Sequence, residues 1–254
     1  MLLPERTRKL LAERLKSGAE DVFGTEPERA AMVQAMRSGK SPMDTAGGEK
    51  LKNLAMGLIF AGPGAKTADL LKLNVARRME EAGATADDIL QNTGWFKGME
   101  GKWKFEIPDN ASRFSTGPLT GGQKVPVTDV LEHPAIYDAY PFLRGMKAQP
   151  MPSDVPQGAV GMFQGPANPG GVMSLAQRAK RDTALHEMQH AIQEQEGFAV
   201  GGKYDVPDLY RRLAGEIEAR NVQSRMMMTT QERLSRPPWL TQDISPEQAI
   251  VRTP

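Results

Sequence analysis

The chain has no cysteine and only three histidines among its 254 residues. Without cysteine it can form neither a disulfide framework nor a thiolate zinc cluster, and its composition fits a reducing compartment or a virion. The histidines are His133, His186 and His190. The third protein ligand of a zinc site that uses two of these histidines must therefore be the remaining histidine or a carboxylate.

The chain also lacks a strong charge of either sign. Its 32 Lys and Arg residues are balanced by 31 Asp and Glu residues, and the net charge is +1. This balance gives no global attraction to nucleic acid or to a membrane surface. The basic residues between Lys97 and Lys104 are too sparse for a nucleic-acid patch. We therefore expect no nucleic-acid partner.

Long hydrophobic runs are absent as well. The most apolar segment, residues 54–63, is about half of the roughly 20 residues that span a bilayer, and it ends in Gly-Pro. We predict that it is buried in the core or docks a partner, and that the chain has no membrane span. Residues 1–17 are charged throughout, so we expect no secretion through a signal peptide.

The most informative motif is His-Glu-Met-Gln-His at residues 186–190. We predict a helix from about residue 176 or 180 to Glu196, ended by Gly197, on which His186 and His190 lie one turn apart and can bind one Zn²⁺ ion. On the helical wheel an apolar arc points away from both histidines, made of Ala184, Leu185, Met188, Ala191 and Ile192. Glu187 is then the expected general base. A plain amphipathic helix is the alternative.

A zinc site needs a third protein ligand, and the best candidates lie in a predicted long helix over residues 206–228. Glu216 falls at the edge of that helix's apolar stripe, whereas Glu218 falls on its far side. Because a ligand must be partly buried, we favour Glu216 and keep Glu218 as the competitor. His133 precedes Pro134, where a turn or cap is a more frequent role than metal binding.

These residues resemble the gluzincin group of zincin-like metallopeptidases, in which HExxH is followed on a later helix by a glutamate in the pattern ExxA. The corresponding residues here are His186, Glu187, His190, Glu216 and Ala219. The resemblance implies peptide-bond hydrolysis by metal-activated water. Zincins of this kind often follow the alanine with an aspartate that steadies the site, but this chain has Arg220 there.

A narrower resemblance is to a domain of the large polyvalent proteins of phages and prophages. It is carried by residues 92–96, 101–107, 185–193 and 214–221, and by Arg-Pro-Pro-Trp at 236–239. The resemblance runs from about residue 65 to the end of the sequence. It implies a phage-encoded protein with a zincin-like core, located in the virion or the host cytoplasm, with other virion proteins as possible partners.

The expected fold is α+β, with a small, mostly antiparallel sheet packed on the HExxH helix and on a second ligand-bearing helix. We predict three parts: an N-terminal helical arm and linker over residues 1–62, a zincin-like domain over 63–235, and a tail over 236–254. Shorter elements follow from capping and alternation. The expected helices begin after Thr67 and at Thr85 and cover 127–140 with a break at Pro134. The expected strands cover 102–107, 142–148, 159–163 and 172–175. In the first of these strands we expect Trp103, Phe105 and Ile107 to lie on one side and to pack in the core.

The function we predict from the sequence is zinc-dependent hydrolysis of a peptide or protein substrate. One of the strands at 159–163 and 172–175 would form the edge that holds an extended peptide by main-chain pairing. Tyr204, Tyr210 and Arg220 are candidate donors to the oxyanion. The alternative is a virion or host-interaction protein that keeps a zincin fold with little or no peptidase activity.

Overall fold

The computed structural model describes residues 31, 34 and 59–253, apart from 108, 110–111, 156–157, 167–169, 203–206, 227 and 229. The predicted N-terminal arm therefore lies outside the described residues, except for residues 31, 34 and 59–62. The described chain divides into two units. Residues 69–97 form the first unit, and residues 59–68 and 98–253 form the second.

The first unit contains two helices, α5 (Leu70–Glu81) and α6 (Ala86–Thr93), followed by β2 (Trp95–Lys97). Thr85 caps α6 as predicted, because its side chain accepts a hydrogen bond from the amide of Asp88. The prediction that Thr67 caps the preceding helix is wrong. Asp69 is the cap, and its carboxylate accepts a hydrogen bond from the amide of Lys72.

The second unit begins with β1 (Ile59–Ala61), which pairs antiparallel with β3 (Trp103–Ile107). All three residues of β1 are buried, so this described part of the apolar run 54–63 belongs to the core. The strand at 102–107 is confirmed, but its buried face differs from the expected one. Lys104 and Glu106 are buried while Trp103 and Phe105 are half-buried, because charged side chains of a later helix pair with the lysine and the glutamate.

The main sheet of this unit has four strands in the order β5 (Val125–Pro126), β7 (Lys147–Pro150), β9 (Val172–Leu175) and β8 (Gly161–Gln164). β7 and β9 are parallel, and the other two pairs are antiparallel. A separate pair is formed by β4 (Arg113–Phe114) and β6 (Leu131–Glu132). The expected α+β fold with small, mostly antiparallel sheets is confirmed.

Three of the sequence-based assignments in this region need adjustment. The segment 127–140 is α7 (Val127–Val130), then β6, then α8 (Pro134–Ala139), because Pro134 starts a new helix whose cap is His133. Residues 142–148 were expected to be a strand, but the 3₁₀ helix η3 (Pro141–Gly145) precedes β7. The strand at 172–175 is confirmed, and the strand expected at 159–163 is β8, shifted to 161–164.

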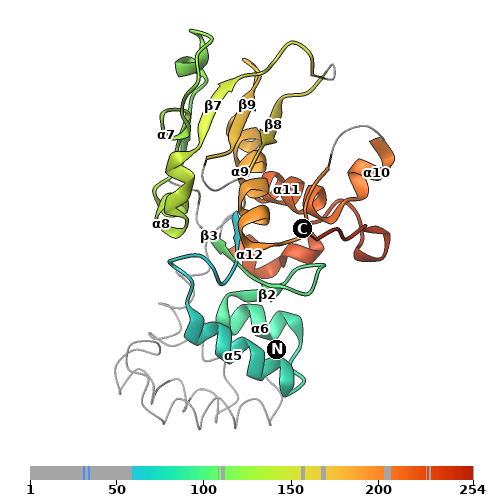
Figure 1. Ribbon diagram of the computed structural model, residues 1–254. Coiled ribbons are helices and arrows are strands. Elements are labelled where there is room, and N and C mark those ends of the chain that lie inside the picture. Colours follow the sequence, from blue (N-terminus) through green and yellow to red (C-terminus); the bar gives the residue numbers. More distant parts are fainter. Residues whose placement is uncertain are drawn as a thin grey trace. The chain divides into compact units, whose positions relative to one another are not determined.

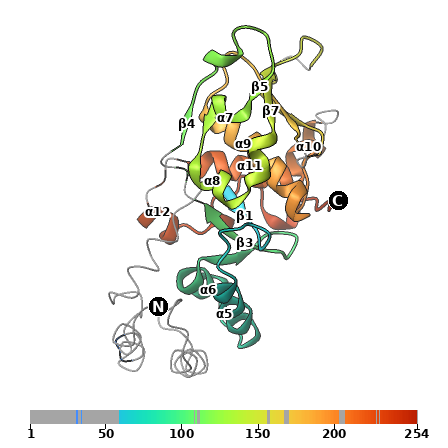
Figure 2. The same ribbon diagram turned by 60° about the vertical axis from the view of Figure 1, so that its left-hand side comes forward.

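Two helices of this unit pack against each other beside β8 and β9 (Figures 1 and 2): α9 (Arg181–Glu196) and α11 (Ala214–Arg225). α9 ends at Gly197 in a left-handed conformation, as predicted, with φ of 63°. Its predicted apolar arc is fully buried, each member being 0 % exposed: Ala184, Leu185, Met188, Ala191 and Ile192.

The long helix expected over residues 206–228 is interrupted. It forms α10 (Pro207–Arg212) and α11, and the break falls at Leu213, which forms a parallel bridge with Ile250. The amide of Ala214 also donates to the carbonyl of Ile250. The backbone of Ile250 therefore forms the hydrogen bonds that Arg212 and Ala214 would form within a continuous helix.

The chain closes with α12 (Thr230–Ser235) and the short 3₁₀ helices η4 (Pro238–Leu240) and η5 (Pro246–Gln248). Another short 3₁₀ helix, η2 (Gly117–Leu119), lies between β4 and β5. None of the helices in the described part of the chain is both long enough and apolar enough to span a bilayer.

Candidate metal centre

The two histidines of the HExxH motif come together on α9 because they lie four residues apart on a regular helix. Their Nε2 atoms are 3.1 Å apart, and their rings meet edge to face with centroids 4.8 Å apart. His186 is 9 % exposed, and the side chain of His190 is 14 % exposed. Both rings are therefore shielded but reachable from solvent.

Glu216 of α11 faces this pair of rings. Its Oε2 lies 3.4 Å from Nε2 of His186, and its Oε1 lies 3.5 Å from Nε2 of His190. One ligand atom from each of the three residues lies within 4.8 Å of the other two. The structure thus brings together the three residues that the sequence singled out as metal ligands.

The electrostatics of this group depend on mutual hydrogen bonding. Burial alone would raise the pKa of Glu216, but hydrogen bonds from His186, His190 and Tyr210 outweigh burial and lower it. Burial alone would lower the pKa of His190, but its interaction with Glu216 raises it to about 9. A metal ion that binds at Nε2 of His190 must displace this proton, so metal binding there releases a proton.

The spacing of the donors fits a zinc ion. Zinc binds histidine nitrogen and carboxylate oxygen at about 2.0–2.2 Å in a tetrahedral shell, where neighbouring ligand atoms are about 3.3 Å apart. The three separations here are 3.1, 3.4 and 3.5 Å. Oε1 of Glu216 accepts a hydrogen bond from the amide of Gly202, whereas Oε2 is buried without a hydrogen bond of normal geometry. Three protein donors also leave one position of such a shell open.

Glu187, the predicted general base, lies between this group and the edge strand β8. A Cβ atom on Gly161 of β8 would overlap the Glu187 carboxylate, so a larger residue at this position would displace that carboxylate. Burial raises the pKa of Glu187, while the two histidines and a hydrogen bond from the backbone of Phe163 act against the rise. A raised pKa makes it easier for a carboxyl group to hold a proton that it has accepted and to donate it later.

Glutamines occupy the outer positions next to the two histidines. Nδ1 of His190 lies 2.9 Å from Oε1 of Gln193, and Nδ1 of His186 lies 3.3 Å from Oε1 of Gln223. An amide oxygen can only accept, so each histidine donates from Nδ1 to its glutamine and has Nε2 facing Glu216. Nε2 is then the atom that can bind a metal ion once it has lost its proton.

The orientation of the Gln193 amide is itself determined by the surrounding buried groups. Its Nε2 donates to the carbonyl of Gly215 at 2.9 Å and to Oε1 of Glu218 at 3.2 Å, so its oxygen is left for His190. Oε2 of Glu218 pairs with Lys104 of β3. Burial raises the pKa of Glu218, and the ammonium group of Lys104 opposes that rise.

Glu218 therefore plays a different part from the one expected. It was placed on the exposed far side of its helix, but it is only 7 % exposed and points toward Lys104 and Gln193. The helical wheel failed here because β3 brings a buried cation to that side. Glu218 pairs with Lys104 and does not belong to the cluster of possible metal ligands formed by the two histidines and Glu216.

Of the other residues considered from the sequence and described by the structure, only one lies next to the candidate metal ligands. Tyr210 lies beside the site and hydrogen-bonds Glu216, whereas Arg220 points away and pairs with Asp243 at 2.8 Å. Tyr204 lies outside the described residues. His133 is a helix cap, as expected, because its Nδ1 accepts the amide of Ile136.

The two glutamines next to the histidines were not predicted from the sequence. The spacing of His190 and Gln193, three positions apart on one helix, was a usable signal because such residues are neighbours. Gln223 had no comparable signal, because it reaches His186 from another helix through tertiary packing.

Among the comparisons with known proteins, a family model matches part of the chain. No curated protein matches the chain, and no solved structure matches it either. The match to large polyvalent protein associated domain 23 covers residues 58–115. This segment includes β1 and β3 but ends before the HExxH helix. Residues 58–115 are therefore similar to a domain associated with large polyvalent proteins.

Proposed function

We propose that the protein is a zinc-dependent peptidase of a phage or prophage, in which His186, His190 and Glu216 hold the ion. The observation that carries this proposal is the geometry of the three donors. They lie at separations of 3.1–3.5 Å and come from two helices that pack against each other. Glutamines next to Nδ1 of the two histidines orient the rings so that both Nε2 atoms face Glu216.

Zinc, when bound, would supply a Lewis acid that activates water and polarises the carbonyl of the scissile peptide bond. Glu187 is placed to take the proton from that water and to deliver it to the leaving amine. Its pKa is raised by burial, which makes its protonated form accessible for the second transfer. Tyr210 keeps its proton because burial raises its pKa, so its hydroxyl is a donor beside the site.

The substrate would lie along β8. β9 pairs with one edge of this strand, and within the described residues no strand pairs with its other edge. The amide of Phe163, in the middle of β8, hydrogen-bonds the Glu187 carboxylate, so this edge borders the site. An extended peptide can add to such an edge by main-chain hydrogen bonds.

The similarity of residues 58–115 to a polyvalent-protein domain supports the phage or prophage origin. We place the protein in the virion or in the host cytoplasm on the same ground. The zincin-like identity of the second unit rests on the motif and on the geometry of the site.

The test uses the full chain, loaded with zinc, and a proteome-derived peptide library read by mass spectrometry. Wild type is compared with Glu187→Gln, which keeps the size of the side chain and removes its base. We expect cleavage by wild type, and a loss of about 10²- to 10⁴-fold in the variant at unchanged zinc content. Equal cleavage by both would refute the role of Glu187. Zinc binding without any cleavage would instead favour a virion or host-interaction protein.

A further inference from the structure

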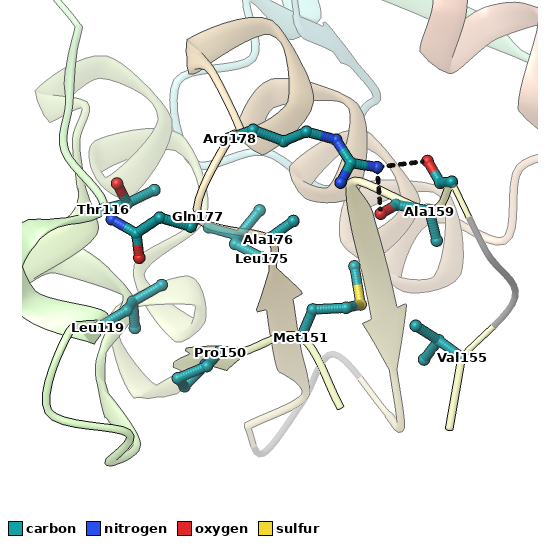
Figure 3. Close-up of a pocket in the computed structure, with 11 residues that line it drawn as sticks. Thr116, Leu119, Pro150, Met151, Val155, Ala159, Leu175, Ala176, Gln177 and Arg178 are labelled. Carbon is teal, nitrogen blue, oxygen red and sulfur yellow. Dashed lines mark hydrogen bonds between the residues drawn. The ribbon is translucent and has the colours of Figure 1, made fainter. Parts of the chain in front are cut away.

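A cavity lies at the end of the four-stranded sheet, where β8 begins and where β7 and β9 end (Figure 3). Its volume is about 380 Å³. This is the lower end of the range of roughly 300–1,000 Å³ for ligand pockets. The cavity therefore suits a group the size of one or two side chains.

The lining of the cavity combines a group of apolar side chains with the polar side chains of Thr116, Gln177 and Arg178. Met151, Val155, Ala159, Leu175 and Ala176 contribute hydrocarbon surface, and Arg178 is the one charged residue among the described lining residues. The guanidinium group of Arg178 donates to the carbonyls of Gly158 and Ala159 at 3.0 and 3.2 Å (Figure 3). These bonds hold a positive charge at the border of the cavity.

The cavity lies just before the start of β8, the strand whose edge borders the candidate metal centre. Residues two apart in a strand direct their backbone groups to the same edge, and this relates Ala159 to Gly161 and Phe163. Phe163 hydrogen-bonds Glu187, Gly161 touches it, and Ala159 lines the cavity. At about 3.3 Å per residue, the cavity begins about 10 Å along the strand from Glu187.

We propose that this cavity is a specificity subsite that receives an apolar side chain of the peptide substrate, about three residues from the cleaved bond. A substrate that pairs with the edge of β8 advances by the same rise per residue as the strand. The residue that reaches Ala159 is therefore separated from the bond at Glu187 by about three positions. A basic side chain is disfavoured at this position because Arg178 carries the same charge.

This inference rests on the proposed peptidase function, and the same peptide library tests it. With wild type, we expect cleaved peptides to be enriched in aliphatic or aromatic residues, and depleted in Lys and Arg, at one position about three residues from the cut. Ala159→Trp fills the cavity. We expect it to reduce kcat/KM for the enriched peptides at least about tenfold, and to spare peptides with Gly or Ala at that position.

Two further variants keep the test specific. Ser153→Trp adds the same side chain to an exposed residue of the preceding loop, outside the lining, and should behave as wild type. Met151→Ala enlarges the cavity and should shift the preference toward larger aromatic residues, which serves as the test if Ala159→Trp lowers zinc content.

The outcomes separate the two proposals. Cleavage with no preference at a fixed position, or with a preference that neither cavity variant alters, overturns the subsite and leaves the peptidase standing. A library that zinc-loaded wild type does not cleave at all overturns both.

Discussion

Two neutral glutamines hold the histidines of this site, where zinc sites often use carboxylates. Gln193 accepts from His190, and Gln223 accepts from His186. A neutral acceptor orients the imidazole without adding negative charge to a cluster that already contains Glu187 and Glu216. The two histidines can therefore be oriented without the aspartate that many zincins have at the position of Arg220.

Replacing Gln193 with leucine should weaken zinc binding about 10- to 100-fold, because His190 loses the acceptor that directs Nε2 toward the ion. The matched control is Gln189→Leu, which removes another fully buried glutamine of α9 whose bonds go to Phe60 and Glu218. Competition with a chromophoric chelator gives both affinities. An equal loss in the control would mean that the effect is general damage to the helix.

At the residue scale, the sequence predicted what spacing alone determines. His186, Glu187 and His190 follow from one helix, and Glu216 follows from the apolar stripe of the next. The role of Glu218 could not be predicted, because its partner Lys104 is 114 positions away and lies on a strand whose buried face appeared apolar. A buried ion pair leaves no periodic signal in either segment.

At the scale of elements, the sequence predicted a helix well where the helix is determined by residues within it and at its ends. α9 has a regular apolar arc and a terminal glycine, and it was predicted to within a few residues. The segment from residue 207 to 225 was predicted as one helix because the bridge between Leu213 and Ile250 is a tertiary contact. The strand β6 was missed because its partner β4 lies about 20 residues earlier.

His133, which caps α8, makes the free energy of unfolding depend on pH. Burial lowers the pKa of His133 to about 4, so the native state stays unprotonated while the unfolded chain, with a pKa near 6.5, takes up a proton. The stability due to this group is complete above pH 6.5 and is lost as the pH falls toward 4, by up to about 3 kcal/mol.

Asparagine at position 133 keeps a capping acceptor and cannot titrate. In urea unfolding at pH 7.5 and 4.5, His133→Asn should therefore lose less stability on acidification than wild type does. If both proteins lose the same free energy of unfolding between these pH values, His133 is not the group responsible.

At the scale of the whole molecule, part of the segment with the family match contacts the two helices that carry the candidate metal ligands. β1 bonds α9 through the backbone of Phe60 and the amide of Gln189, with both distances 3.0 Å. β3 reaches α11 through Lys104 and Glu218, and through Glu106 and Arg225, which lie 2.8 Å apart. Within the second unit, the matched strands and the ligand helices therefore share one buried network.

Lys104→Met should lower the free energy of unfolding by about 3–5 kcal/mol, because it strands the buried carboxylates of Glu100 and Glu218. Glu218→Gln should cost less, since the amide keeps hydrogen-bonding capacity and Lys104 retains Glu100. Denaturant titration of the two variants ranks them. A lysine variant as stable as wild type would show that the network does not contribute to folding.

The zinc content of the purified full chain shows whether the protein binds zinc through Glu216. Wild type, Glu216→Gln and Glu218→Gln are dialysed against the same chelator and analysed by elemental mass spectrometry. We expect one zinc per chain in wild type and in Glu218→Gln, and much less than one in Glu216→Gln. Full zinc content in Glu216→Gln, or a loss confined to Glu218→Gln, would contradict this expectation.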